Sequence, residues 1–137
     1  MQVEKYMTKG AITAHERDGL HQTYVRMRER DVRHMPVIDE HEKLVGVISD
    51  RDIRRPDWVD PTENVSRPFV LDNNTKVAEA MTRGAITVQE GDLMLEAVGA
   101  FVDHHVGALM VTDAAGNLVG VLSVVDAMKA FRDILSE

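Results

Sequence analysis

A serine followed three residues later by an aspartate occurs twice, as Ser49 with Asp52 and as Ser123 with Asp126. Each pair comes where a strand-like apolar run gives way to a helix-like segment. A helix N-terminus presents unpaired N–H groups and a partial positive charge, so it can bind phosphate. The serine hydroxyl can add a hydrogen bond, and an ionised aspartate can accept both hydroxyls of a ribose. The two pairs therefore suit a nucleoside phosphate.

The same spacing also has a purely structural interpretation. A serine at the N-cap with an acidic residue three positions on resembles a capping box, although Glu or Gln is the usual partner. Such a cap contributes about 1 kcal/mol of helix stability. The residues alone leave capping and ligand binding open. Arg51 lies inside the first pair and could neutralise a phosphate, whereas Val125 stands at the matching position of the second.

Both Ser-Asp pairs belong to a longer internal repeat. Residues 3–53 align with 77–127 at a constant shift of 74 positions, and eighteen of the 51 paired residues are identical. Average composition predicts roughly one identity in fifteen by chance, so the repeat organises the whole chain. Two equivalent units of about 60 residues usually pack on each other, and a cleft between them is where a ligand would sit.

The two repeats carry the same order of secondary-structure signals. Apolar residues three and four apart predict helices, and β-branched or continuous apolar runs predict strands. Each repeat is therefore expected to be a βαββα unit preceded by a short apolar helix, in an α+β fold. Asp18 and Asp92 are expected to cap the helices that follow them. The expected helices are 3–7, 20–27, 77–81, 94–102 and 124–135, and the expected strands are 12–13, 35–38, 44–48, 86–88, 108–111 and 118–122.

The domain organisation follows from the repeat. The first repeat is expected over residues 1–55 and the second over 75–137. Residues 56–74 are expected to be a linker, because three prolines and an Asp-Asn-Asn run predict extended chain with turns. A single unit of this size would be marginally stable, so the repeats are expected to depend on each other. The apolar stripe along 124–135 can pack inside the chain or pair with a second chain.

Composition narrows the classes of partner. The net charge of −7 disfavours nucleic acid and anionic membranes. Arginines cluster at 26–33 and 51–55, which leaves open a local anion site beside the ordinary interpretation as a solvated helix face. No apolar run approaches the roughly 18 residues that span a bilayer. The N-terminus has no apolar signal core, so a cytoplasmic location is the default expectation.

The sequence has few of the residue patterns that indicate catalysis or metal binding. The chain has no cysteine, which excludes disulfides and thiolate chemistry. Its six histidines form no His-Glu-x-x-His motif and no pair four residues apart, and His104 and His105 are expected to end a helix. No Ser-His-Asp arrangement and no Gly-x-x-x-x-Gly-Lys loop occurs. We therefore expect no enzyme, no metal site and no cofactor.

Over nearly its whole length the chain resembles a tandem pair of cystathionine-β-synthase (CBS) domains, often called a Bateman module, of the small stand-alone bacterial type. The resemblance rests on the order of the elements, the two Met-Thr-x-Gly starts, the His-Met-Pro-Val-Ile-Asp segment at 34–39, the Leu-Val-Gly-Val runs and the Ser-x-x-Asp pairs. It implies two βαββα repeats packed by pseudo-twofold symmetry, with two clefts between them. Family members commonly bind AMP, ADP, ATP or S-adenosylmethionine there, and two modules often form a flat homodimer.

The resemblance also implies which residues line the ligand. Asp52 and Asp126 match the ribose-binding aspartate. Arg33 matches a position where a basic residue often meets phosphate, but its counterpart in the second repeat is Gly107. One cleft is therefore expected to bind phosphorylated nucleotides more tightly than the other. The remaining matches are Ser49 and Ser123 before the aspartates, Arg51 for phosphate, Met35 and Leu109 as walls of the adenine site, and Thr8, Ile12, Thr13, Thr82, Ile86 and Thr87 in the first-strand segments.

The implied function is a regulatory module that senses adenosine nucleotides and passes the change to a partner protein. A ligand can do so only by binding two arrangements of the protein with different affinity. The alternative is a structural dimerisation module without ligand, in which the Ser-Asp pairs act only as helix caps. A nucleic-acid or metal-binding role is a weaker alternative, because the acidic balance and the missing motifs disfavour it.

Overall fold

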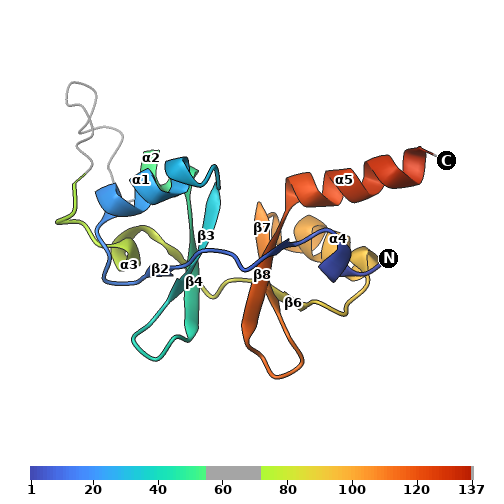
Figure 1. Cartoon of the computed structure of the whole chain (residues 1–137), viewed down its shortest axis with the longest axis horizontal. Helices are drawn as coiled ribbons and strands as arrows, with labels where there is room; N and C mark the ends of the chain where they lie inside the picture. The colour runs from blue at the N-terminus through green and yellow to red at the C-terminus, as the bar shows by residue number, and fades with distance from the viewer. Residues whose placement is uncertain (55–71, 137) are drawn as a thin grey trace. The chain divides into compact units, whose positions relative to one another are not determined.

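The computed structural model describes residues 1–54 and 72–136, which fall into two compact units. Unit 1 consists of residues 1–11 and 85–137, and unit 2 consists of residues 12–84. Residues 1–11 of the first sequence repeat thus belong to unit 1, and residues 75–84 of the second belong to unit 2. Most of the expected linker, 56–74, lies outside the described residues. Figure 1 labels most of the helices and strands of both units.

Unit 2 is built on a four-stranded sheet in the order β2-β3-β4-β5. β2 runs parallel to β3, and the other two strand pairs are antiparallel. α1 packs against α2, which follows directly from β4. The elements are β2 (Ala14–His15), α1 (Leu20–Glu29), β3 (His34–Ile38), β4 (Leu44–Ser49), α2 (Asp50–Arg54), α3 (Val77–Ala80) and β5 (Thr82–Arg83).

Unit 1 has a matching four-stranded sheet in the order β1-β8-β7-β6. β6 runs parallel to β7, and the other pairs are antiparallel. α4 packs against β7 and against α5. The elements are the 3₁₀ helix η1 (Val3–Lys5), β1 (Thr8–Lys9), β6 (Thr87–Gln89), α4 (Met94–His104), β7 (Ala108–Thr112), β8 (Leu118–Ser123) and α5 (Val124–Leu135). The α+β class and the two βαββα repeats predicted from the sequence are therefore confirmed.

One edge strand of each sheet comes from the other sequence repeat. β1, near the N-terminus, pairs with β8 and places Thr8 opposite Val121. β5, at the start of the second repeat, pairs with β4 and places Thr82 opposite Val47. Two-residue strands carry no periodicity, so neither strand, and not this exchange, could be predicted from the pattern of residues.

Glycines allow these edge strands to approach the sheets closely. A Cβ atom on Gly120 would lie 2.5 Å from the carbonyl oxygen of Thr8, and one on Gly46 would lie 2.6 Å from the carbonyl oxygen of Thr82. Both distances are far inside van der Waals contact, and both obstructing atoms belong to the backbone. The two close approaches explain why the Leu-Val-Gly-Val run of each repeat has glycine at its third position.

Gly120→Ala is expected to lower the free energy of unfolding by about 1–3 kcal/mol, the usual cost of forcing an extra atom into a packed site. Gly99→Ala in α4 is the matched control, because a Cβ there meets no atom within 4 Å. That control is expected to be neutral or to stabilise by up to about 1 kcal/mol, since alanine is the better helix former. Urea unfolding followed by circular dichroism measures both, and equal effects would contradict the close approach.

Each unit has its own hydrophobic core around a central strand. In β7, residues 108–111 are all buried, and in β3 residues 35–37 are buried. Successive side chains point to opposite faces of a strand, so both faces of β3 and β7 are covered, as their continuous apolar character suits. The buried cores consist of Ala14, Leu20, Met27, Met35, Val37, Ile48, Ile53 and Val77 in unit 2, and of Val3, Met7, Val88, Met94, Ala97, Leu109, Val111, Leu122, Ala127 and Ala130 in unit 1.

The helix ends differ partly from expectation. The carboxylate of Asp18 accepts the His15 N–H at 3.0 Å, and the equivalent Asp92 accepts the Gln89 N–H at 2.8 Å. These aspartates therefore close the turns before the helices, and the prediction that they cap the helices was wrong. A free backbone N–H in the first turn of α1 instead finds its acceptor in a distant segment. Asn73 Oδ1 accepts the Gln22 N–H at 2.9 Å.

Other boundaries are close to those predicted. α5 spans Val124–Leu135 as expected, and α4 ends at His104, followed by His105 with a left-handed φ of 54°. The strands expected at 12–13 and 86–88 lie one or two residues later, at Ala14–His15 and Thr87–Gln89. Within the described ranges, every helix is too short or too polar to cross a membrane.

Candidate functional site

Ser49 and Asp52 hydrogen-bond to each other at the start of α2. The Ser49 N–H donates to Asp52 Oδ2 at 2.9 Å, and the Asp52 N–H donates to Ser49 Oγ at 3.1 Å. Ser123 and Asp126 form the same pair at the start of α5, again at 2.9 and 3.1 Å. The capping interpretation is therefore confirmed in both repeats.

The cap uses only one carboxylate oxygen of each aspartate. The serine N–H takes Oδ2, whereas an ionised carboxylate offers two oxygens and about four acceptor positions. The Lys129 ammonium lies 4.0 Å from Oδ1 of Asp126, at the edge of ion-pair distance. Asp126 is 8% exposed and Asp52 is partly buried, so the cap holds each carboxylate in a fixed direction. Each could accept a sugar hydroxyl without giving up its cap.

The arginines expected to meet phosphate stand beside the first pair. Arg33 immediately precedes β3, and its carbonyl oxygen accepts the Asp50 N–H of the first helical turn at 2.9 Å. Its side chain is exposed, as is that of Arg51 one residue further into α2. Unit 2 thus carries two exposed arginines that adjoin the Ser49–Asp52 cap along the backbone.

The second pair has the same backbone and lacks these cations. The Val124 N–H donates to the Gly107 carbonyl oxygen at 3.1 Å, which repeats the hydrogen bond between Asp50 and Arg33. The second repeat has Gly107 at the position of Arg33, and it has Val125 at the position of Arg51. The difference between the repeats is therefore one of side-chain charge on a shared backbone.

The other predicted residues divide between the units. Unit 2 holds Ile12, which packs on the core, partly buried Thr13, and exposed Thr82 on β5. Unit 1 holds exposed Thr8 on β1, Ile86 against the core, and exposed Thr87 on β6. Thr8 and Thr82 each join the sheet that carries the Ser-Asp pair of the other repeat. Met35 and Leu109 are fully buried in the two cores, and their contact with adenine stays a prediction.

His34 is a further polar neighbour of the first pair. It begins β3 directly opposite Ser49. Partial burial lowers the pKa of its imidazole below the ordinary value, although the carboxylates of Asp50 and Asp52 act to raise it. From the sequence, His34 was one of six histidines weighed for a metal site and part of the 34–39 family segment, and no role at the Ser-Asp pair was predicted for it. Among the residues that the structure describes, no group of three or more His, Asp or Glu side chains could hold a metal ion.

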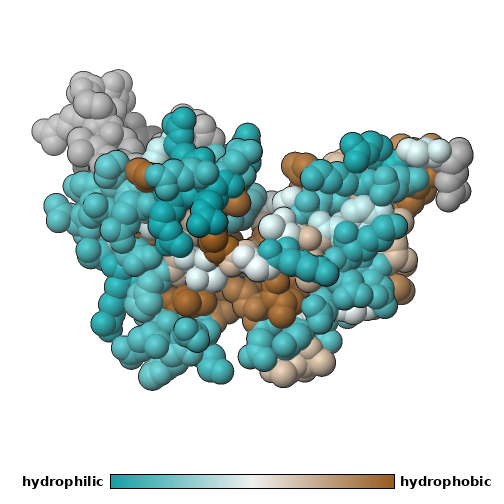
Figure 2. All heavy atoms as spheres, in the orientation of Figure 1, coloured by the Kyte–Doolittle hydropathy of each residue, from teal (hydrophilic) through white to brown (hydrophobic). Residues whose placement is uncertain are grey.

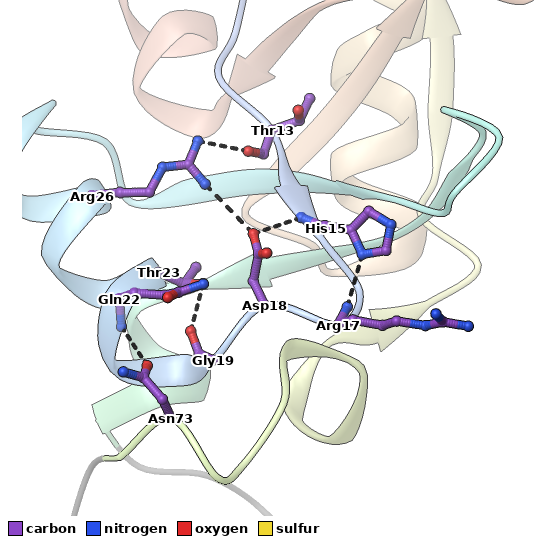
Figure 3. A network of polar contacts seen from close by, with 9 residues as sticks. All are labelled: Thr13, His15, Arg17, Asp18, Gly19, Gln22, Thr23, Arg26 and Asn73. Carbon is purple, nitrogen blue, oxygen red and sulfur yellow. Dashed lines mark hydrogen bonds and ion pairs between the residues drawn. The ribbon is translucent and has the colours of Figure 1, made fainter.

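A polar network holds the segment that leads into β2 (Figure 3). Arg26 Nη2 of α1 donates to the Thr13 carbonyl oxygen at 2.8 Å, and its Nη1 lies 3.7 Å from Asp18 Oδ2. The same Asp18 oxygen accepts the His15 N–H. Arg26 was expected only as a member of the 26–33 arginine cluster, on a solvated helix face or at a local anion site, and its contact with Thr13 was not predicted.

Comparison with known proteins gives relatives that are mostly much longer. The chain is 34% identical over 96 residues to inosine-5′-monophosphate dehydrogenase of Mycobacterium tuberculosis, covering 69% of this chain and 16% of that protein. It is 25% identical over 129 residues to L-aspartate semialdehyde sulfurtransferase of Methanocaldococcus jannaschii, covering 94% and 23%. The chain thus spans about a fifth of the length of these relatives.

Solved structures match over nearly the full chain. The CBS domain pair of protein MJ0100 in complex with 5′-methylthioadenosine and S-adenosyl-L-methionine is 25% identical, with a TM-score of 0.75 over 96% of this chain and 99% of that one. CBSX2 of Arabidopsis thaliana, solved in complex with AMP, is 24% identical, with a TM-score of 0.76 over 97% of both chains.

The family model for the CBS domain matches twice, at residues 3–57 and 77–133, which together cover most of the chain. The two matches coincide with the internal repeat, and each contains one Ser-Asp cap. The chain therefore belongs to the CBS-domain family, as a tandem pair of CBS domains.

Proposed function

We propose that this CBS pair is a regulatory module that binds adenosine nucleotides and transmits their presence to a partner protein. The observation that carries the proposal is the pair of Ser-Asp caps, which fix a carboxylate with spare acceptor capacity at a helix start in each repeat. The candidate ligands are AMP, ADP, ATP and S-adenosylmethionine. The role is regulatory, and no reaction is assigned to the chain.

The relatives support the ligand class. CBSX2 was solved with AMP, and the MJ0100 domain pair with 5′-methylthioadenosine and S-adenosyl-L-methionine. These ligands share the adenosine group, whose ribose hydroxyls suit Asp52 and Asp126. The activities of the longer relatives are not transferred, because this chain spans only a small part of them.

The charge difference between the repeats refines the proposal. Arg33 and Arg51 are exposed beside the Ser49–Asp52 cap, and Gly107 and Val125 replace them in the second repeat. Charge-assisted hydrogen bonds to phosphate are about twice as strong as neutral ones. We infer that nucleotides with a phosphate prefer the site served by these arginines, whereas the other site discriminates less between AMP and adenosine.

A thermal-shift assay tests the proposal. At a concentration 100 times its dissociation constant, a ligand that binds only the folded protein adds about 2.7 kcal/mol of stability. AMP, ATP or S-adenosylmethionine is therefore expected to raise the Tm by several degrees. GMP serves as the control ligand, since it has the same ribose and phosphate with a different base. Unchanged Tm with all the adenosine compounds would favour the structural alternative.

That alternative, a dimerisation module, is favoured by the surface of unit 1. α5 buries Ala127 and Ala130 in the core but leaves Met128, Phe131 and Leu135 more than half exposed. α4 likewise exposes Leu95 (78%) and Val102 (65%). In Figure 2, brown and pale spheres appear along α5, whereas the surface over α1 is mainly hydrophilic. Exposed apolar faces of this extent mark interaction sites.

We infer that a second copy of the chain covers this surface, so that the nucleotide-sensing module is a homodimer. Self-association suits the surface because a twofold contact places identical apolar stripes against each other without requiring a different partner. Dimerisation and ligand binding use different residues, so the module can combine both. Under the alternative function, the chain would form the same homodimer and would bind no ligand.

A further inference from the structure

The first-strand segments are anchored differently in the two units. In unit 1, Thr87 belongs to β6 and lies opposite Met110 of β7. The Met110 N–H donates to the carbonyl oxygen of Ile86 at 3.0 Å. The segment Ile86–Thr87 is therefore held by the sheet itself.

Unit 2 cannot use the same hydrogen bond. The residue of β3 that corresponds to Met110 is Pro36, which has no N–H to donate. β2 accordingly begins only at Ala14, where the ladder with Val37 starts. Thr13, the counterpart of Thr87, lies outside the strand.

Arg26 provides the missing anchor. Its Nη2 donates to the Thr13 carbonyl oxygen at 2.8 Å, and Asp18 Oδ2 lies 3.7 Å from its Nη1 and holds the His15 N–H as well (Figure 3). The planar guanidinium of Arg26 thus links α1 to Thr13, which precedes β2, and to Asp18, which follows it. The corresponding residue in unit 1 is Ala100, which has no donor in its side chain.

We propose that Arg26 is a positioning residue for the adenosine ligand of unit 2, holding Ile12 and Thr13 in place where Pro36 has removed the strand hydrogen bond. The inference rests on the proposed function and on the family resemblance, which implies that Ile12 and Thr13 line the ligand. Arg26 acts through the Thr13 backbone and does not itself touch the ligand. Its role is therefore independent of the ligand's phosphate.

Arg26→Met and Arg28→Met separate positioning from charge. Arg28 is an exposed arginine of the same helix, and its guanidinium contacts only Tyr24 among the interactions described, at 3.3 Å from the hydroxyl. Both variants remove one positive charge. Isothermal titration with AMP and with uncharged adenosine is expected to give about tenfold weaker binding of both ligands in Arg26→Met, and changes below about twofold in Arg28→Met. Arg26→Lys, which can reach one acceptor, is expected to recover part of the loss.

Equal losses in the two variants, or a loss for AMP alone, would overturn the role, because charge would then suffice as the explanation. A second measurement needs no ligand: the ¹³C carbonyl shift of Thr13 is expected to change in Arg26→Met and to stay constant in Arg28→Met. Wild-type protein that binds none of adenosine, AMP, ADP, ATP and S-adenosylmethionine would overturn the proposed function and this role with it. Normal wild-type binding with unchanged affinity in Arg26→Met would overturn the role of Arg26 alone.

Discussion

Asp52→Asn and Asp126→Asn are each expected to weaken adenosine binding by about 100-fold at the site that the residue serves. Two hydrogen bonds from the ribose hydroxyls to a carboxylate contribute about 1.5–3 kcal/mol each, and losing 3 kcal/mol corresponds to roughly two orders of magnitude in affinity. Asparagine keeps one oxygen that can accept the serine N–H, so the cap and the fold are expected to survive. Isothermal titration gives both the affinity and the number of sites lost.

AMP distinguishes the two variants. Because Arg33 and Arg51 lie in the same unit as Asp52, we expect Asp52→Asn to remove the tighter AMP site and Asp126→Asn to remove the weaker one. Adenosine, without phosphate, is expected to respond equally to both changes. Equal responses to AMP would contradict the asymmetry. Ser49→Ala is the control for capping: it removes the hydroxyl acceptor of the cap and is expected to cost about 1 kcal/mol of stability while the carboxylate remains.

Phe131→Glu is expected to convert the proposed homodimer into a monomer at micromolar concentration. Phe131 is 52% exposed in the middle of the apolar stripe of α5, with Met128 and Leu135 on the same face. Truncating a central aromatic residue of an interface commonly costs 2 kcal/mol or more, which is about a 30-fold loss of affinity, and a buried unpaired carboxylate adds to it. Sedimentation equilibrium of wild type and variant measures the change.

Val25→Glu on α1 is the matched control for this surface. Val25 is also an exposed apolar residue on a helix, at 38%, but it lies in unit 2 among arginines. The control is expected to leave the dimer intact. A wild-type monomer at high concentration would reject the homodimer, and an intact dimer of Phe131→Glu would place the interface on another face. Circular dichroism checks that both variants stay folded.

The sequence was informative wherever a pattern extended over several residues. The apolar stripe of 124–135 predicted α5 with both boundaries correct, because six apolar residues at helical spacing leave little choice. Its residues are Val124, Ala127, Met128, Phe131, Ile134 and Leu135. The repeat located both Ser-Asp pairs at strand-to-helix junctions, where the structure has them. The end of α4 at His104 and His105 was also predicted locally, because a positively charged side chain suits the C-terminus of a helix.

Features that depend on distant segments were not predictable. Thr8 and Thr82 lie on two-residue strands whose partners are more than 30 residues away, so no local pattern marks them. Asp18 looked like a helix cap, yet its carboxylate turns back to His15 while Asn73 serves the helix. The anchoring of Thr13 by Arg26 combines three segments and could only be found in three dimensions.

The exchange of edge strands has a consequence for the descent of the protein. Its two halves are similar enough to indicate duplication of a single-repeat gene. One such repeat could not complete its own sheet, because β1 belongs with β8 and β5 with β4. Two copies could complete both sheets if each contributed its short N-terminal strand, equivalent to β1 or β5, to the sheet of the other, as in domain swapping. A single repeat expressed alone is therefore expected to pair with a second copy through these edge strands, whereas the tandem chain makes the same pairing intramolecular.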